Sequence, residues 1–207
     1  MTSSDGLPSW LNVARETAQK LHALCDLVKR WNPAINLVAK STVPDLWQRH
    51  LLDSAQLFAY CPSAAKKWLD LGSGAGFPGL VMAIIAAEQR PDLVVTLVES
   101  DRRKSVFLGE AVRLLGLSAK IICQRIEDVK PQGADVLSAR ALAPLAVLCG
   151  YAHIHLTGGG VAVLPKGAQA KTEIDDAQVR WQFDCDSHNS RTDPDAAILI
   201  LKDIRNV

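Results

Sequence analysis

The spacing of apolar residues along the chain changes near residue 67. Before that point, apolar residues recur at helical intervals over residues 9–31 and again near 44–60, which predicts two amphipathic helices. We expect Ser9 to cap the first helix and Trp31-Asn32-Pro33 to end it, because the residue before a proline avoids the α region. Both helices precede the first predicted strand, so they should form an extension packed on the rest of the chain.

From that point onward, short apolar runs alternate with helical segments. The runs are rich in Val, Ile and Leu, which is typical of strands buried on both faces of a parallel sheet. Two further apolar runs after the last helix are separated only by a polar, turn-rich segment, so we expect them to pair as an antiparallel hairpin. The predicted strands are 67–71, 93–99, 119–124, 134–139, 161–165, 180–185 and 196–203, and the predicted helices of this part are 79–89, 101–115, 142–153 and 168–179.

This order predicts an α/β fold with a mostly parallel, doubly wound sheet that ends in an antiparallel hairpin. Many methyltransferases that depend on S-adenosylmethionine (SAM) have such a mixed sheet. The chain has 207 residues, of which 48% are hydrophobic, and this is enough for one domain with a full core. We therefore predict a single domain, with residues 1–62 as a helical extension and residues 63–207 as the α/β core.

Four glycines follow the first predicted strand within eight positions: Gly72, Gly74, Gly76 and Gly79. A strand, a glycine-rich loop and a helix in this order form the nucleotide site of many α/β folds, because glycine lets the backbone approach a ligand closely. The last three glycines match G-x-G-x-x-G, so their spacing does not decide between NAD and SAM. The alternative is a glycine-rich turn without a ligand.

Acidic residues stand at the predicted carboxyl ends of two later strands, where open α/β sheets bind their ligands. Glu99 ends the second strand, and its carboxylate could accept both ribose hydroxyls of a nucleoside. The alternative for Glu99 is an acid that stabilises the N-terminus of the next helix. Glu127 and Asp128 end the third strand, where they could reach the edge of an adenine or lie in a surface turn.

Basic residues occupy similar positions. Arg140 could bind the SAM carboxylate or a substrate phosphate with two hydrogen bonds, or be an ordinary exposed arginine, and Lys166 follows the fifth strand. The run Arg102-Arg103-Lys104 opposes the dipole at a helix N-terminus and suggests an RNA phosphate nearby, although a solvated charge run is the simpler explanation. His50 lies on an apolar stripe, so we interpret it as a core histidine in preference to a catalytic one.

Charge and cysteine content narrow the function further. The net charge is +1 and no segment is strongly basic, so a nucleic-acid partner would have to bind a local patch. No apolar run approaches the ~20 residues that span a bilayer, and the first eight residues lack a signal-peptide core, so we expect no membrane association. The five cysteines are scattered without a C-x-x-C pair, which indicates reduced thiols in the cytoplasm and no metal site.

Two motifs of nucleic-acid methyltransferases are absent from the sequence. The fourth strand ends in Ser138-Ala139-Arg140-Ala141, without the Asn/Asp-Pro-Pro-Tyr type of motif associated with exocyclic amino nitrogens. No Pro-Cys pair is present, and a cytosine-C5 enzyme would use one for its nucleophile. A methyltransferase with this sequence would therefore act on an acceptor whose methylation needs neither motif.

Five segments of the chain match the motifs of a known family, in the same order. They are Trp31-Asn32-x-x-x-Asn36-Leu37, Arg49-His50-Leu51-Leu52-Asp53-Ser54, Asp70 to Gly79, Glu99-Ser100-x-x-Arg103-Lys104 and Ser138-x-Arg140-Ala141. Together they resemble the bacterial RsmG (GidB) family, the 16S rRNA guanine-N7 methyltransferases. The Phe-Pro-Gly end of the glycine loop and the Arg-His-x-x-Asp-Ser segment are its most specific parts.

The resemblance implies a class I SAM-binding fold and transfer of the SAM methyl group to N7 of a guanine in 16S rRNA, within the small ribosomal subunit. We expect a monomer in the cytoplasm. RNA contacts are expected at Arg102, Arg103, Lys104 and Lys166. The resemblance implies SAM contacts at Gly72, Phe77, Ile126, Glu127 and Arg140. The glycine loop and the strand ends themselves suggest Gly74 and Glu99 as further contacts.

Guanine N7 carries a lone pair and no proton, so methyl transfer to it needs no general base. Positioning and desolvation should supply the catalysis, and we predict no catalytic side chain. We expect Arg140 on the SAM carboxylate or a phosphate, because binding guanine O6 and N7 would cover the nucleophile. The alternatives are an NAD-dependent oxidoreductase, a SAM methyltransferase with a small-molecule or protein acceptor, and a protein that holds SAM as a regulatory ligand on RNA.

Overall fold

The computed structural model describes residues 7–207, and the first six residues of the predicted extension lie outside this range. The strands form one sheet in the order β3-β2-β1-β4-β5-β7-β6. Strands β1 to β5 are parallel, and β7 lies between β5 and β6, antiparallel to both, so the predicted fold class is confirmed. The strands are β1 (Lys67–Leu71), β2 (Val94–Val98), β3 (Ala119–Ile122), β4 (Ala134–Ala139), β5 (Leu156–Lys166), β6 (Trp181–Asn189) and β7 (Ala197–Asn206).

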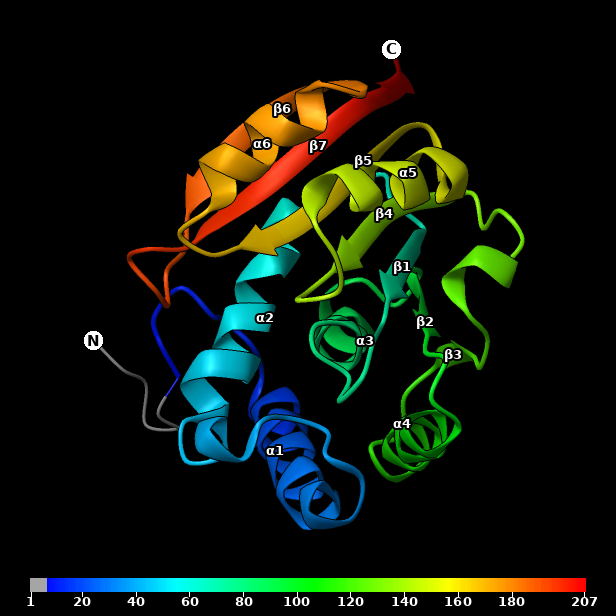
Figure 1. The fold of residues 1–207 in the computed structure, drawn as a ribbon. Helices are drawn as coiled ribbons and strands as arrows, with labels where there is room; N and C mark the ends of the chain where they lie inside the picture. Colours follow the sequence, from blue (N-terminus) through cyan, green and yellow to red (C-terminus); the bar gives the residue numbers. More distant parts are fainter. Residues whose placement is uncertain (1–6) are drawn as a thin grey trace.

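Helices cover both faces of the sheet (Figure 1). On one face, α3 packs against β2 and α4 against β3, and α1 lies outside these two helices and contacts both. On the other face, α5 contacts β4, β5 and β7, and α6 contacts β6. The helices are α1 (Arg15–Ile35), α2 (Asp53–Ala55), α3 (Gly79–Gln89), α4 (Arg102–Leu114), α5 (Leu145–His155) and α6 (Ala170–Gln178).

Helix α1 differs from the prediction at both ends. It begins at Arg15, so the prediction that Ser9 caps it is wrong; the free N–H of Ala14 instead donates to both carboxylate oxygens of Glu88, at 3.0 Å each. It also continues through Pro33 to Ile35 and is capped by Asn36, whose φ is +49°. A proline in the last turn removes the donor of one hydrogen bond only, and the carbonyl that loses it belongs to the exposed Lys29. No helix within residues 7–207 is long and apolar enough to cross a bilayer.

The second predicted helix is one helical segment with three geometries. A π-helix over Trp47–Leu52 continues into α2 and then into a 3₁₀-helix over Gln56–Tyr60. π-Helical turns are rare and occur frequently at functional sites. This segment carries His50 and Asp53, and it packs beside α3, so it lies close to the glycine loop at the start of that helix.

Candidate active site

The glycine loop is anchored by a buried acid at the end of β1. Asp70 is fully buried; its Oδ2 accepts the N–H of Gly79 at 3.1 Å, and its Oδ1 accepts the hydroxyl of Ser138 at 2.7 Å. The indole N–H of Trp68 donates to that same hydroxyl at 2.8 Å. Burial raises the pKa of Asp70 to about 6, against these hydrogen bonds and the positive charge of Arg140. The chain of bonds ties β1, β4 and the start of α3 together beneath the loop.

A cavity of about 380 Å³ lies beyond the carboxyl ends of β1, β2 and β4. Gly72 forms part of its wall with φ at +64°, and a Cβ there would lie 2.7 Å from Leu142, so this position favours glycine on two grounds. Most of the residues predicted to bind the cofactor meet here. The cavity is lined by Gly72, Gly74, Val98, Glu99, Ser100, Lys104, Arg125, Ile126, Glu127, Arg140, Ala141, Leu142 and Tyr151.

Glu99 joins the glycine loop to the start of α4. Its Oε2 accepts the N–H of Gly74 at 2.8 Å and its Oε1 accepts the N–H of Asp101 at 2.7 Å. The cap of α4 is Asp101, whose carboxylate accepts the N–H groups of Arg103 and Lys104. A carboxylate offers about four lone-pair positions, so Glu99 retains acceptor capacity for two ribose hydroxyls. That role stays a prediction, and the geometry is compatible with it.

The far wall of this cavity is a short 3₁₀-helix, Ile126–Asp128, with Tyr151 of α5 beside it. The hydroxyl of Tyr151 donates to Oε1 of Glu127, and this bond lowers the pKa of Glu127 and raises that of Tyr151. Asp128 is exposed and does not line the cavity. Sequence analysis missed Tyr151, because a lone tyrosine in the middle of a predicted helix carries no motif.

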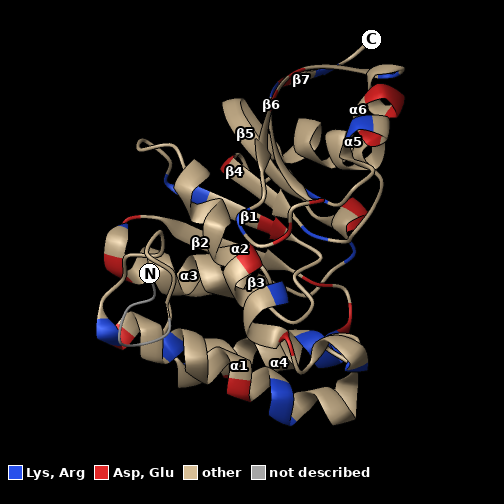
Figure 2. Cartoon of the chain, turned by 90° about the vertical axis from the view of Figure 1, so that its left-hand side faces the viewer, with Lys and Arg blue, Asp and Glu red and all other residues tan. Residues whose placement is uncertain are grey.

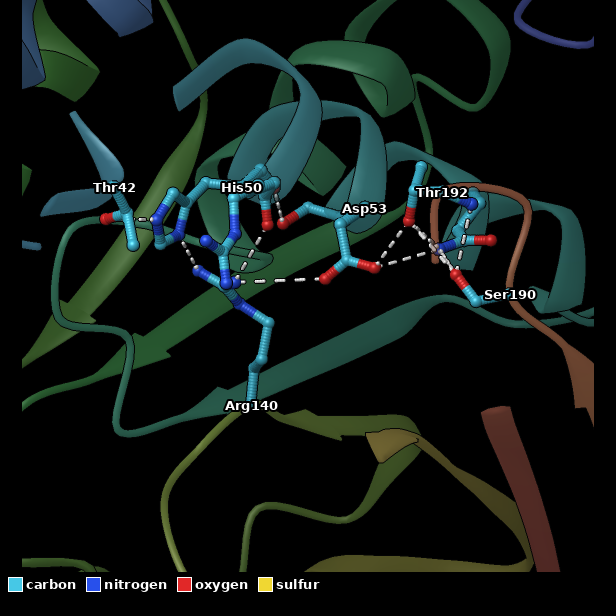
Figure 3. Close-up of polar contacts among 9 residues, drawn as sticks. Thr42, His50, Asp53, Arg140, Ser190 and Thr192 are labelled. Carbon is cyan, nitrogen blue, oxygen red and sulfur yellow. Dashed lines mark hydrogen bonds and ion pairs between the residues drawn. The ribbon is translucent and has the colours of Figure 1, made fainter. Parts of the chain in front are cut away.

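Arg140 lies in the wall of the cavity but turns its guanidinium toward the helical segment (Figure 3). Its Nη2 donates to His50 Nδ1 at 2.8 Å, and its Nη1 lies 3.8 Å from Asp53 Oδ2. His50 therefore belongs to the site as a partner of Arg140. The Arg140 guanidinium carbon lies 5.6 Å from the centre of the Phe77 ring. The centres of the His50 and Phe77 rings are 5.5 Å apart. Because the Phe77 ring is buried there and does not line the cavity, its contact with the cofactor stays a prediction.

A second, larger cavity of about 750 Å³ lies beside the first, and Arg140, Ala141 and Leu142 belong to the walls of both. Lys166 lines it, with its ammonium 2.7 Å from Glu173 Oε2 and 3.1 Å from the carbonyl of Ala143. The Lys166 side chain is only 9% exposed, so its charge is directed at Glu173 in this structure. Contact of Lys166 with RNA stays a prediction.

Two hydroxyls of the β6–β7 loop complete the polar network (Figure 3). Thr192 Oγ1 donates to Asp53 Oδ1 at 3.0 Å, and Gln56 Nε2 contacts Asp53, Ser190 and Thr192 within 3.2 Å. Burial raises the pKa of Asp53, while the charge of Arg140 lowers it. The Arg-His-x-x-Asp-Ser segment was a signal for Asp53; no sequence signal pointed to the loop.

Basic side chains are also found outside the two cavities. Arg102 and Arg103 are exposed at the start of α4, while Lys104 lines the smaller cavity. Figure 2 shows Lys and Arg on α1 and on α4, which pack against each other. Arg103 lies 3.7 Å from its helix-capping neighbour Asp101. Contact of Arg102, Arg103 and Lys104 with RNA stays a prediction.

A glycine-loop cavity at the carboxyl edge of a mostly parallel sheet, with an antiparallel final pair, defines the class I SAM-dependent methyltransferases. Solved structures share this fold. A TehB-like SAM-dependent methyltransferase from Corynebacterium glutamicum is 14% identical with a TM-score of 0.56, and the match covers 87% of this chain and 98% of that one. TYW2 from M. jannaschii, solved in complex with AdoMet, is 13% identical with a TM-score of 0.58, and the match covers 78% of each chain.

The family follows from closer relatives. The model of the GidB family, described as rRNA small subunit methyltransferase G, matches residues 17–194. Ribosomal RNA small subunit methyltransferase G of Ruegeria sp. (strain TM1040) is 48% identical over 197 residues, 95% of this chain and 96% of the relative. The protein of that name from Cereibacter sphaeroides (strain ATCC 17029) is 50% identical over the same length and the same shares.

The chain therefore belongs to the rRNA small subunit methyltransferase G family. The predictions of this family, of a methyltransferase and of SAM as its cofactor are confirmed. The alternative of an NAD-dependent oxidoreductase is wrong. The glycine spacing alone left that alternative open, because both cofactors use the same close approach of the backbone.

Proposed function

We propose that this protein transfers the methyl group of SAM to N7 of a guanine in 16S rRNA, and that its substrate is the rRNA within the small ribosomal subunit. The observation that carries the proposal is the pair of adjoining cavities, which share the wall formed by Arg140, Ala141 and Leu142. The smaller cavity lies at the glycine loop and suits a nucleoside. The larger one, about 750 Å³, has room for a nucleotide base brought in from outside.

The residues of the smaller cavity fit SAM. Glu99, Ile126 and Glu127 line it, so Glu99 would accept the ribose hydroxyls and the backbone at Ile126 and Glu127 would contact the adenine. Arg140 supplies positive charge for a carboxylate, and its buried Nε has no hydrogen-bond partner among the described residues. When bound, SAM supplies an electrophilic methyl group on a positively charged sulfur. We assign the cofactor to Gly72, Gly74, Phe77, Glu99, Ile126, Glu127 and Arg140.

The chain's own contribution is to position the two reactants and exclude water. N7 of guanine offers a lone pair without a proton, so no side chain has to accept one at the reacting atom. His50, the nearest histidine to Arg140, has its pKa lowered to about 4 by burial and by the charges of Arg140 and Arg49. Its Nδ1 faces the Arg140 guanidinium, so that lone pair is already engaged. This arrangement supports the prediction that catalysis uses no general base.

RNA binding is assigned to a smaller set of residues. We propose that Arg102, Arg103 and Lys104 contact phosphates beside the smaller cavity, and that Lys166 lies near the acceptor base. The target guanine must be exposed or turned out of its helix to enter the larger cavity. Action as a monomer in the cytoplasm is part of the proposal, and size-exclusion chromatography with light scattering tests the oligomeric state.

The test is methyl transfer from radiolabelled SAM to small ribosomal subunits isolated from cells that lack this protein. Subunits from normal cells, whose target base is already methylated, are the matched control. We expect label in 16S rRNA of the deficient subunits only. Borohydride reduction and aniline cleavage, which break the chain at N7-methylguanine, locate the base. Label at an exocyclic nitrogen or in protein would contradict the proposal.

A further inference from the structure

We infer that His50 is a positioning residue: it holds the Arg140 guanidinium in the wall between the two cavities, ready for the carboxylate of the SAM methionine group. The inference rests on the proposed function insofar as it assigns Arg140 to that carboxylate. Four segments that are distant in sequence meet at this point. They are the loop with Thr42, the helical segment with His50 and Asp53, the end of β4 with Arg140, and the β6–β7 loop (Figure 3).

The direction of each hydrogen bond in this network is fixed by chemistry. Arginine has donors only, so Arg140 Nη2 must donate to His50 Nδ1, 2.8 Å away. The proton of the neutral imidazole must then lie on Nε2, which donates to Thr42 Oγ1 at 2.9 Å. Thr42 Oγ1 in turn donates to the carbonyl of Ala39 at 2.8 Å. One tautomer of neutral His50 fits, and the backbone of the loop holds its ring in place.

The bond to His50 is the shortest polar contact of the Arg140 side chain among the described residues. The carbonyl of Arg49 is 3.4 Å from Nη1, and Asp53 Oδ2 is 3.8 Å from the same atom, beyond hydrogen-bond distance. Nε is buried and has no partner among the described residues. The guanidinium lies over the Phe77 ring, which supports one side of it. Arg140 is therefore held at one end and keeps unused donors for a ligand.

A neutral partner is what this role requires. A carboxylate at position 50 would hold Arg140 firmly but would compensate the charge that is meant for the ligand. The imidazole fixes the guanidinium and leaves its charge available. Asp53 is the nearest acid, and its Oδ1 accepts hydrogen bonds from Thr192 and Gln56, which hold it 3.8 Å from the arginine.

The experiment measures binding of two ligands that differ in the group Arg140 is meant to bind. S-adenosylhomocysteine carries the carboxylate; 5′-methylthioadenosine has the same nucleoside and a thioether but lacks it. We expect His50→Leu to raise the dissociation constant of S-adenosylhomocysteine about tenfold in isothermal titration. The dissociation constant of methylthioadenosine should change by less than about twofold. His50→Asn should restore most of the affinity, because its Oδ1 takes the place of Nδ1. Gln48→Leu, on the exposed side of the same segment, is the matched control.

Arg140→Ala should raise the dissociation constant of S-adenosylhomocysteine by about tenfold or more. Adding His50→Leu to the Arg140→Ala variant should weaken binding little further, because His50 acts through Arg140. Thr42→Val should give the same ligand-selective loss in smaller measure, and it keeps the inference testable if His50→Leu does not fold. Equal weakening of both ligands, or independent effects of His50 and Arg140, would overturn the inference. The titration uses no RNA, so a wrong acceptor assignment would leave its result standing.

Discussion

Asp70 is expected to make the stability of this protein depend on pH in an unusual direction. Burial raises its pKa from an ordinary 3.8 to about 6 in the folded protein. The folded state therefore binds this proton more tightly than the unfolded state does. The resulting stabilisation is fully present below pH 3.8 and is lost as the pH rises through about 6. At 1.36 kcal/mol per pH unit, the interval between the two values corresponds to about 3 kcal/mol.

Urea unfolding of the wild type and of Asp70→Asn, followed from about pH 7.5 to 4.5, isolates this effect, because the other titrating groups are common to both proteins. Over that range the free energy of unfolding of the wild type should rise relative to the variant by about 2 kcal/mol. Ser138→Ala removes a hydrogen bond that favours the charged form, so it should raise the pKa of Asp70 further and move the rise to higher pH. A difference that stays constant, or falls as the pH is lowered, would refute the reasoning.

Three further outcomes are expected. Gly79→Ala should lower the free energy of unfolding by about 2–3 kcal/mol in the same assay, because its Cβ would lie 2.2 Å from Leu97 and 2.6 Å from the Asp70 carboxylate. A decrease of less than about 0.5 kcal/mol would show that the start of α3 can shift. Glu99→Gln should raise the dissociation constant of SAM at least about tenfold in titration, since it loses the charge that strengthens its bonds to the N–H groups of Gly74 and Asp101 and would strengthen the proposed bonds to the ribose. Unchanged affinity would remove Glu99 from the proposed site. Replacing Arg102 and Arg103 together with alanine should reduce the salt dependence of binding to the ribosomal subunit while SAM affinity stays within about twofold of wild type.

The strands and the helices beside them could be predicted because their signals are local. The bounds of β1, β4 and α3 agree with prediction to the residue, since each is an apolar run closed by a turn or a glycine loop. The ends of α1 could not be predicted in this way. Its start depends on the Glu88 carboxylate of α3. The destabilisation caused by Pro33 depends on whether the backbone carbonyl that loses its hydrogen bond is exposed to water.

For the site, too, local sequence signals predicted the positions of residues but not their long-range contacts. The glycines, Glu99, Glu127 and Arg140 could be found because each follows a strand, and the carboxyl ends of parallel strands meet at one edge. The direction of a side chain is not contained in such a pattern. Arg140 turns toward His50, and Lys166 toward Glu173, because of partners 90 and 7 residues away in the chain.

The contacts of Asp53 with the β6–β7 loop have a consequence for synthesis of the chain. Asp53 and Gln56 are translated more than 130 residues before Ser190 and Thr192. The surroundings of Arg140 are therefore complete only when the β6–β7 loop has also left the ribosome. A truncated product that ends before this loop would keep the glycine loop and β1 to β5, yet Asp53 would lack Thr192, one of its two hydrogen-bonding partners. Such fragments should be poor competitors for the cofactor or the ribosomal subunit.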